Sequence, residues 1–183
     1  MNRFIRQGFL ALGLAVLSGV FTGPLFSAEK TKASVIFIVR HAEKSAPNGD
    51  LPLSEAGRER AETLAAMLAP AGVAHVFHTE MIRARETAAP LAARLGLNPK
   101  VIPVTAGEAL VAKLSQIPTG SMALVVNHSG TIPALLEKLG APKPAPIDEG
   151  SYDRMFVVIR TPEGSVSSFE LRYGRITSSK VAH

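Results

Sequence analysis

The feature that most constrains this chain is a regular alternation of short strand-like segments with longer helical ones. Apolar and β-branched runs of about five residues predict buried strands, and apolar residues three and four positions apart predict the helices between them. This alternation is typical of an α/β domain: a three-layer sandwich with a mostly parallel central sheet and helices on both faces. The expected strands are 34–39, 73–77, 101–104, 122–126, 155–159 and 166–171.

Start and stop signals place the expected helices between these strands. Ser54 is expected to cap a helix that continues to about Leu68, because Pro70 and Gly72 follow it. The other expected helices are 81–95, 108–114 and 130–139. The turn residues 161–164, with the sequence Thr-Pro-Glu-Gly, separate the last two strands and predict a C-terminal hairpin at the sheet edge.

The N-terminus has the parts of a secretory signal. Arg3 and Arg6 precede an apolar run over 8–20, and the small residues Ser27 and Ala28 follow it. We expect residues 1–28 to be a signal peptide, leaving 29–183 as a single domain with no stable membrane insertion. The alternative is an uncleaved N-terminal anchor, because the bulky Phe26 lies three residues before the expected cut. Either reading predicts a periplasmic or secreted protein.

Charge and cysteine content exclude several classes of function. Loss of Arg3 and Arg6 with the signal lowers the formal charge of +5 to about +3. This small excess suits an anionic substrate, but the chain has no lysine and arginine cluster with interleaved aromatic residues, so nucleic acid is not an expected partner. There is no cysteine, which excludes disulfides and thiol chemistry.

Polar residues that suit phosphate chemistry follow three predicted strands. Arg40 and His41 come directly after the first strand, and His128 directly follows another and is expected to open the next helix. Arg83 is expected in the first turn of a helix that begins just after a strand. Because ligand sites in open α/β sheets lie beyond the carboxyl ends of the strands, we expect these four side chains to meet.

Two histidines and two arginines fit a phosphoryl group. Arginine can bind two phosphate oxygens at once, and a neutral imidazole is a competent nucleophile. Attack by His41 on phosphorus would give a phosphohistidine, while Arg40, Arg83 and a protonated His128 would stabilise the transition state. Metal binding is not expected, because no third ligand accompanies His75 and His78 at suitable spacing.

Four motifs in order resemble the histidine phosphatase superfamily, in its phosphoglycerate-mutase-like branch, and in particular its small phosphohistidine-phosphatase-like members. They occur over roughly residues 34–140, most of the chain that would remain after signal cleavage. The matching segments are Arg40-His41-Ala42, Leu53-Ser54 with Gly57 and Ala61, Arg83 with Thr87-Ala88, and Asn127-His128-Ser129-Gly130. The resemblance implies that His41 is the phosphorylated nucleophile and that Arg40, Arg83 and His128 bind the phosphate, without a cofactor or metal.

The chain departs from the family pattern in two places. Ala42 stands where the family usually has glycine. The general acid of the mutase-like branch is a glutamate after the third strand, and Glu108 is the nearest match, although some small members lack this acid and Glu108 would serve equally well as a helix cap.

These observations predict a metal-independent phosphatase that hydrolyses phosphomonoesters in the periplasm or cell envelope. The short connections predict an open pocket, which suits a phosphorylated envelope glycan or a phosphorylated protein side chain. The alternatives are a catalytically silent phosphate-binding module of the envelope and a phosphotransferase like phosphoglycerate mutase.

Overall fold

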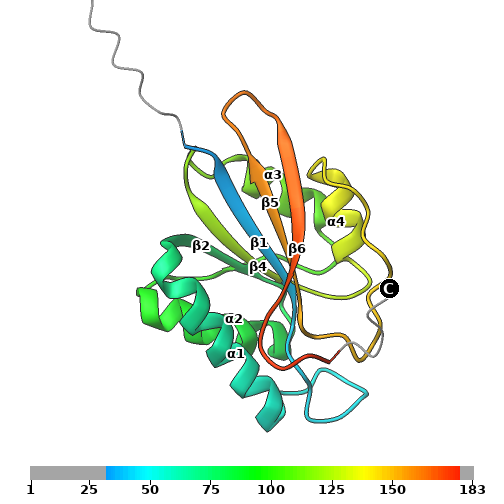
Figure 1. Ribbon diagram of the computed structural model, residues 1–183. Coiled ribbons are helices and arrows are strands. Elements are labelled where there is room, and N and C mark those ends of the chain that lie inside the picture. The colour runs from blue at the N-terminus through cyan, green and yellow to red at the C-terminus, as the bar shows by residue number, and fades with distance from the viewer. Residues whose placement is uncertain (1–31, 178–183) are drawn as a thin grey trace, which may run out of the picture.

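Residues 32–177, which the computed structural model describes, form three layers around a six-stranded sheet (Figure 1). The strand order is β3-β2-β4-β1-β5-β6. The strands are β1 (Ser34–Arg40), β2 (Val73–His78), β3 (Lys100–Val101), β4 (Met122–Asn127), β5 (Arg154–Arg160) and β6 (Val166–Arg172). The first four run parallel, whereas β5 and β6 form an antiparallel hairpin beside β1. The predicted α/β sandwich with an edge hairpin is confirmed.

Two helices cover each face of the sheet (Figure 1). The helices α1 (Glu55–Leu68) and α2 (Ile82–Leu95) lie on one face, and α3 (Gly107–Ser115) and α4 (Ile132–Lys138) lie on the other. Each face has its own apolar core. The first core includes Val39, Leu64, Leu91, Leu124 and Met155, and the second includes Ile38, Leu114, Val125, Ile132 and Phe156. Burial of these side chains holds the strand ends in fixed positions.

The local signals in the sequence explain where α1 and α2 begin and end. The Ser54 side chain accepts a hydrogen bond of 3.1 Å from the Gly57 amide and so caps α1. A short 3₁₀ turn, Ala69–Ala71, follows this helix, and Gly72 then adopts a positive φ of 81° that favours glycine. The helix α2 ends in the same way at Gly96.

Two expected elements are shorter than the sequence suggested, and proline accounts for both. The expected strand 101–104 is reduced to the two residues of β3, because Pro103 has no amide hydrogen to donate to a neighbouring strand. The expected helix 130–139 begins only at Ile132, because Pro133 is tolerated in the first turn of a helix and not further inside it. His128 therefore lies in the turn before α4 and does not open the helix.

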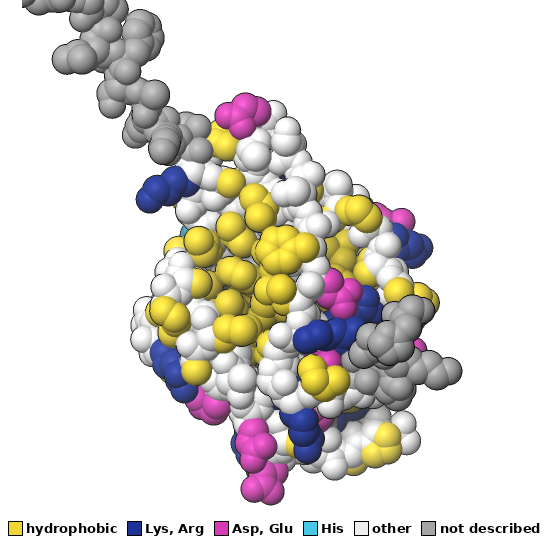
Figure 2. All heavy atoms as spheres, in the orientation of Figure 1, with side chains coloured by type: hydrophobic (Ala, Val, Ile, Leu, Met, Phe, Trp, Pro, Cys, Tyr) yellow, Lys and Arg dark blue, Asp and Glu magenta, His cyan; other side chains and the backbone are white. Residues whose placement is uncertain are grey.

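The sheet is incompletely covered on the face that carries α1 and α2. Figure 2 shows apolar side chains gathered on this face over β1, β5 and β6, beside α1. Phe169 and Leu171 of the edge strand β6 are 49% and 44% exposed, and Phe37 of β1 is only partly buried. The hairpin therefore lies outside the layer that the two helices cover.

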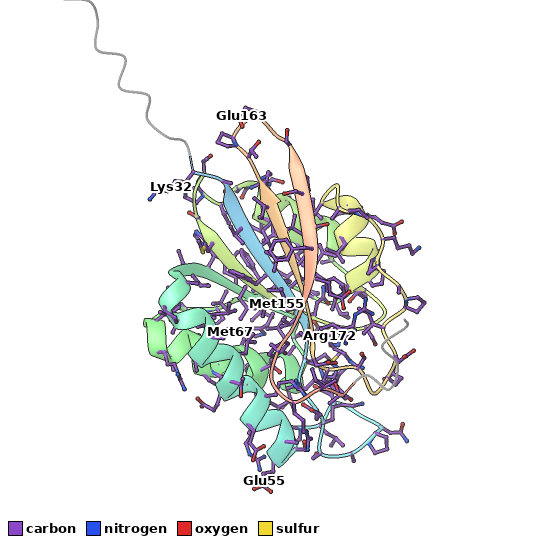
Figure 3. The ribbon with its side chains drawn as sticks, viewed as in Figure 1. Lys32, Glu55, Met67, Met155, Glu163 and Arg172 are labelled. Atoms are coloured by element: carbon purple, nitrogen blue, oxygen red, sulfur yellow. The ribbon has the colours of Figure 1, made fainter. Side chains whose placement is uncertain are left out.

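The amino end of β1 is remote from the strand ends that carry the candidate site. Figure 3 places Lys32, where the chain enters β1, and Glu163, in the turn between β5 and β6, at this opposite end of the sheet. Within residues 32–177, no helix combines the length and the apolar character needed to cross a membrane. The expected signal peptide, 1–28, lies outside the described residues.

Candidate active site

The two histidines meet because β1 and β4 are neighbouring parallel strands. Arg40 is paired with Asn127 in the sheet register, and the His41 amide donates a hydrogen bond of 2.9 Å to the Asn127 carbonyl. His128 follows immediately, so the centres of the His41 and His128 rings lie 5.2 Å apart. The structure thus brings together the two strand-end histidines that the sequence singles out.

The hydrogen bond of the His41 ring leaves the other ring nitrogen free to attack. Its Nδ1 lies 2.8 Å from the Ala42 carbonyl oxygen, and since a carbonyl only accepts, Nδ1 carries the hydrogen. The Nε2 atom then presents its lone pair. Burial, partly opposed by this hydrogen bond and reinforced by the charge of Arg40, lowers the pKa of His41 to about 3. The ring is therefore neutral and nucleophilic at neutral pH.

His128 is also neutral in the free protein. Its Nδ1 lies 3.5 Å from Arg83 Nη2, which can only donate, so the hydrogen is on Nε2, and Nε2 lies 2.9 Å from the Thr79 hydroxyl. Burial, followed by the charge of Arg83, lowers the pKa of His128 to about 4, although Glu80 acts in the opposite direction. His128 is therefore uncharged in the free protein, and the protonated His128 that the sequence analysis expects in the transition state stays a prediction.

Arg40 is almost fully buried, and its guanidinium is held rigidly. Its Nη1 donates to three backbone carbonyls of the loop before β5, those of Asp148, Glu149 and Ser151. The guanidinium carbon lies 4.2 Å from the centre of the Tyr152 ring, which in turn lies 6.0 Å from the His41 ring. The remaining contact, between Nη2 and the Glu149 carboxylate, is 2.9 Å long. Arg40 is therefore a fixed cation beside the nucleophile.

Arg83 approaches the histidines from the first turn of α2. Its Nη1 forms an ion pair of 3.1 Å with Asp50, which also accepts a hydrogen bond of 3.0 Å from the Ile82 amide. Asp50 belongs to the loop between β1 and α1, so this loop helps to aim the guanidinium. Its contact with His128 shows that Arg83 reaches the same site as Arg40, from a different element.

Thr87 was noted in the sequence only as part of a motif, and the structure gives it a definite role. Its buried hydroxyl donates a hydrogen bond of 2.7 Å to the Arg83 carbonyl and accepts one of 2.9 Å from the Ala42 amide. One side chain thus links the helix that carries Arg83 to the loop that carries His41. Its position one helical turn after Arg83 is the signal that could have revealed this link.

A buried ion pair between Glu43 and Arg60 supports the loop after His41, and no motif in the sequence indicates it. Arg60 of α1 donates two hydrogen bonds of 2.9 Å to the carboxylate of Glu43. It also donates to the carbonyls of Tyr173 and Arg175 at 2.9 and 2.7 Å. Arg60 therefore ties the loop after His41 to the segment after β6, and no local pattern in the sequence indicates contacts over such a separation.

Glu108, the residue matched to the family's general acid, lies on the first turn of α3. Its carboxylate is 80% exposed and forms an ion pair with Lys138 of α4. It lines a groove between these helices to which Asn127 and Thr131 also contribute. The structure describes no contact between Glu108 and either histidine, and its role as the acid stays a prediction.

Taken together, the site offers a neutral nucleophile, a neutral hydrogen-bond donor and two arginines at one sheet edge. A phosphoryl group needs positive charge on its oxygens and a nucleophile in line with the leaving group. Arg40 and Arg83 supply the charge, and His41 Nε2 supplies the nucleophile. Among residues 32–177, no group of three histidine, aspartate or glutamate side chains is arranged to hold a metal ion.

Comparison of the structure with solved proteins shows a shared fold. The protein histidine phosphatase SixA complexed with tungstate has 19% identity and a TM-score of 0.60, covering 75% of this chain and 96% of that one. The mycobacterial glucosyl-3-phosphoglycerate phosphatase has 17% identity and a TM-score of 0.60, with 80% and 99% covered. The phosphoglycerate mutase of Plasmodium falciparum has 21% identity and a TM-score of 0.57, with 83% and 99% covered.

The sequence comparisons address the family. No curated protein matches this chain by sequence. Residues 36–110 match the family described as "Histidine phosphatase superfamily (branch 1)". This region contains three of the four motifs, including His41 and both arginines, and the fourth motif places His128 5.2 Å from His41, between ring centres. The match confirms the predicted resemblance to the histidine phosphatase superfamily over residues 36–110.

Proposed function

We propose that this protein hydrolyses phosphomonoesters through a phosphohistidine on His41 Nε2, without a metal ion. The observation that carries the proposal is the state of the His41 ring: its hydrogen is fixed on Nδ1 by Ala42, and its low pKa keeps Nε2 unprotonated. In the first step Nε2 attacks phosphorus and the ester oxygen leaves. In the second step water attacks the phosphohistidine, which releases phosphate and restores the free ring.

The arginines and His128 support both steps. Arg40 and Arg83 neutralise the phosphoryl oxygens, and His128 donates through Nε2. Because a phosphoryl dianion close to His128 favours its charged form, we expect substrate binding to raise the pKa of His128 above its value of about 4 in the free protein. Substrate would therefore produce the protonated His128 that the free protein lacks.

We further propose an exported enzyme that acts on bulky phosphorylated substrates, such as an envelope glycan or a phosphorylated protein side chain. The signal-like pattern over residues 1–28 supports export. Open grooves on both sides of α4 support a large substrate, since they leave room beyond the phosphate site. N-terminal sequencing of the periplasmic fraction tests the location: an intact N-terminus in the cytoplasmic fraction would contradict it.

The test of the activity is phosphate release by the purified protein from a panel of phosphomonoesters, with a chelator present, compared with His41→Ala. We expect release that survives the chelator and is abolished in the variant. Acid quenching followed by ³¹P NMR in alkaline denaturant should show phosphate on the Nε2 position of a histidine. Binding of phosphate without turnover of any compound would instead indicate the silent binding module.

A further inference from the structure

Two grooves flank α4, and each contains one glutamate. The groove between α3 and α4 has a volume of about 310 Å³ and contains Glu108. The groove on the other side has a volume of about 490 Å³ and lies between α4 and the loop that follows it, drawn in yellow and orange in Figure 1. It is lined by Ser129, Pro133, Lys143, Pro146, Ile147 and Glu149.

The second groove leads directly to the phosphate-binding arginine. Three backbone carbonyls occupy Nη1 of Arg40, which leaves Nη2 and the buried Nε, an atom without a partner among the described residues, to meet a further anion. In the free protein the Glu149 carboxylate occupies Nη2, at 2.9 Å. Its second oxygen lies 3.5 Å from the hydroxyl of Ser129, the residue after His128. The carboxylate of Glu149 therefore lines this groove and also occupies an Arg40 nitrogen that could bind a phosphoryl oxygen.

The Glu149 side chain is free to turn when substrate arrives. Although its carboxylate touches a buried arginine, the side chain is 88% exposed, and only its backbone carbonyl is fixed, by Arg40 Nη1 at 2.6 Å. A phosphoryl dianion competes strongly for Nη2, since its charge is greater than that of a carboxylate. A carboxyl group that stays beside that dianion is most stable when it carries a proton, because two negative groups at such a distance repel each other.

We propose that the leaving group of the substrate lies in the groove between α4 and the 143–149 loop, and that Glu149 is the catalytic acid that protonates it. This inference rests on the proposed phosphatase function. Glu149 takes a proton from solvent as substrate displaces it from Arg40. When His41 Nε2 forms its bond to phosphorus, the bond from phosphorus to the ester oxygen breaks, and the Glu149 proton moves to that oxygen. The Glu149 carboxylate then takes a proton from the water that attacks the phosphohistidine.

The position of Glu108 favours this assignment. The partner of Glu108 is Lys138, on the side of α4 away from the 143–149 loop, whereas the partner of Glu149 is Arg40, next to the nucleophile in sequence. Glu149 comes more than one element after Glu108, the residue that matches the family's general acid. The proposed reaction thus keeps the step of acid catalysis and assigns it to a different residue. The groove beside it combines proline and isoleucine surfaces with the ammonium of Lys143, which pairs with Glu137 at 3.6 Å, and this lining favours a protein side chain over a glycan as the leaving group.

The experiment compares Glu149→Gln with the matched variant Glu108→Gln, using p-nitrophenyl phosphate and an alkyl phosphate as substrates. The nitrophenolate leaves without a proton, whereas the alkoxide needs one, and general acids contribute about 100-fold or more to such steps. We expect Glu149→Gln to lose about 100-fold in kcat with the alkyl phosphate and less than about threefold with p-nitrophenyl phosphate. Glu108→Gln should resemble wild type with both.

Three results would overturn the inference. The first is equal kcat for wild type and Glu149→Gln with the alkyl phosphate. The second is a lower KM with unchanged kcat, which would make Glu149 only a competitor for Arg40. The third is a loss that depends on the leaving group in Glu108→Gln. The proposed phosphatase function is tested separately. It is supported in all three cases if the wild type hydrolyses either ester and His41→Ala does not.

Discussion

Glu43 and Arg60 are joined by two hydrogen bonds of 2.9 Å, so the loop that carries His41 is anchored to the middle of α1. Both side chains are largely shielded from water, and Arg60 is the more buried of the two. Removing one partner of a buried pair leaves the other charge uncompensated, which costs more than the pair itself contributes.

We therefore expect Arg60→Ala to lower the free energy of unfolding by about 3–5 kcal/mol, measured by urea denaturation. The exposed pair of Arg94 and Glu62 is a matched control, and Arg94→Ala should cost less than about 1 kcal/mol. In the double variant Glu43→Ala with Arg60→Ala, much of the loss should be recovered, since neither charge is then left alone. Equal losses of unfolding free energy in Arg60→Ala and Arg94→Ala would show that the pair of Arg60 with Glu43 does not stabilise the fold more than an exposed pair does.

The two histidines should make the protein less stable in mild acid. Their pKa values, about 3 for His41 and about 4 for His128, lie below the value of about 6.5 in an unfolded chain. At pH values between the folded and the unfolded pKa, the unfolded chain binds more protons than the folded protein. The free energy of unfolding therefore falls as pH is lowered from about 6.5. Each histidine accounts for up to about 2 kcal/mol of this loss at pH 5.

Urea denaturation between pH 5 and pH 7.5 measures this slope. His128→Asn should have a flatter profile than wild type, because the group that titrates is removed, and His41→Asn should behave likewise. Bound inorganic phosphate should oppose the loss by holding a proton on His128. Profiles of identical slope in all three proteins would contradict the low pKa values.

The hydroxyl of Thr87 should matter more than its methyl group. In Thr87→Val the Ala42 amide loses its acceptor, and a buried unsatisfied donor costs about 1–3 kcal/mol. Thr87→Ser keeps the oxygen and should recover most of the stability. We also expect kcat to fall in Thr87→Val and to recover in Thr87→Ser, because the contact fixes the backbone next to His41. If valine and serine variants had the same kcat, the link would be structural alone.

Gly57 should not tolerate a side chain. A Cβ at this position would overlap the carbonyl oxygen of Glu43, whereas a Cβ at Gly107, in the first turn of α3, would meet no atom. We expect Gly57→Ala to destabilise the protein by about 2 kcal/mol or more and to lower kcat, because the loop after His41 must shift. Gly107→Ala is the control, and thermal unfolding with parallel assays compares the two. Equal melting temperatures of Gly57→Ala and Gly107→Ala would show that the loop after His41 can move away from α1 without loss of stability.

The sequence predicted the layers, the mostly parallel sheet and the meeting of His41 with His128, because strand patterns and the rule for parallel sheets are local and general. It misplaced the start of α4, since the pattern of apolar residues outweighed the effect of Pro133. It also did not indicate that His128 is neutral in the free protein, which depends on burial and on the charge of Arg83. The contacts of Glu149 with Arg40 and of Arg60 with Glu43 join separate segments of the chain, so no spacing of residues in the sequence predicts them.

The contacts of Arg60 with the Tyr173 and Arg175 carbonyls bear on how this enzyme is made. The ribosome produces the residues of the site in order, and His41, Arg83 and His128 all precede β6. Yet Arg60, which holds the loop after His41 through Glu43, gains two of its four contacts only from the segment that follows the last strand. A nascent chain that has released Glu149 but not Tyr173 thus contains all the residues proposed for the reaction and still lacks two of the hydrogen bonds that hold the loop after His41.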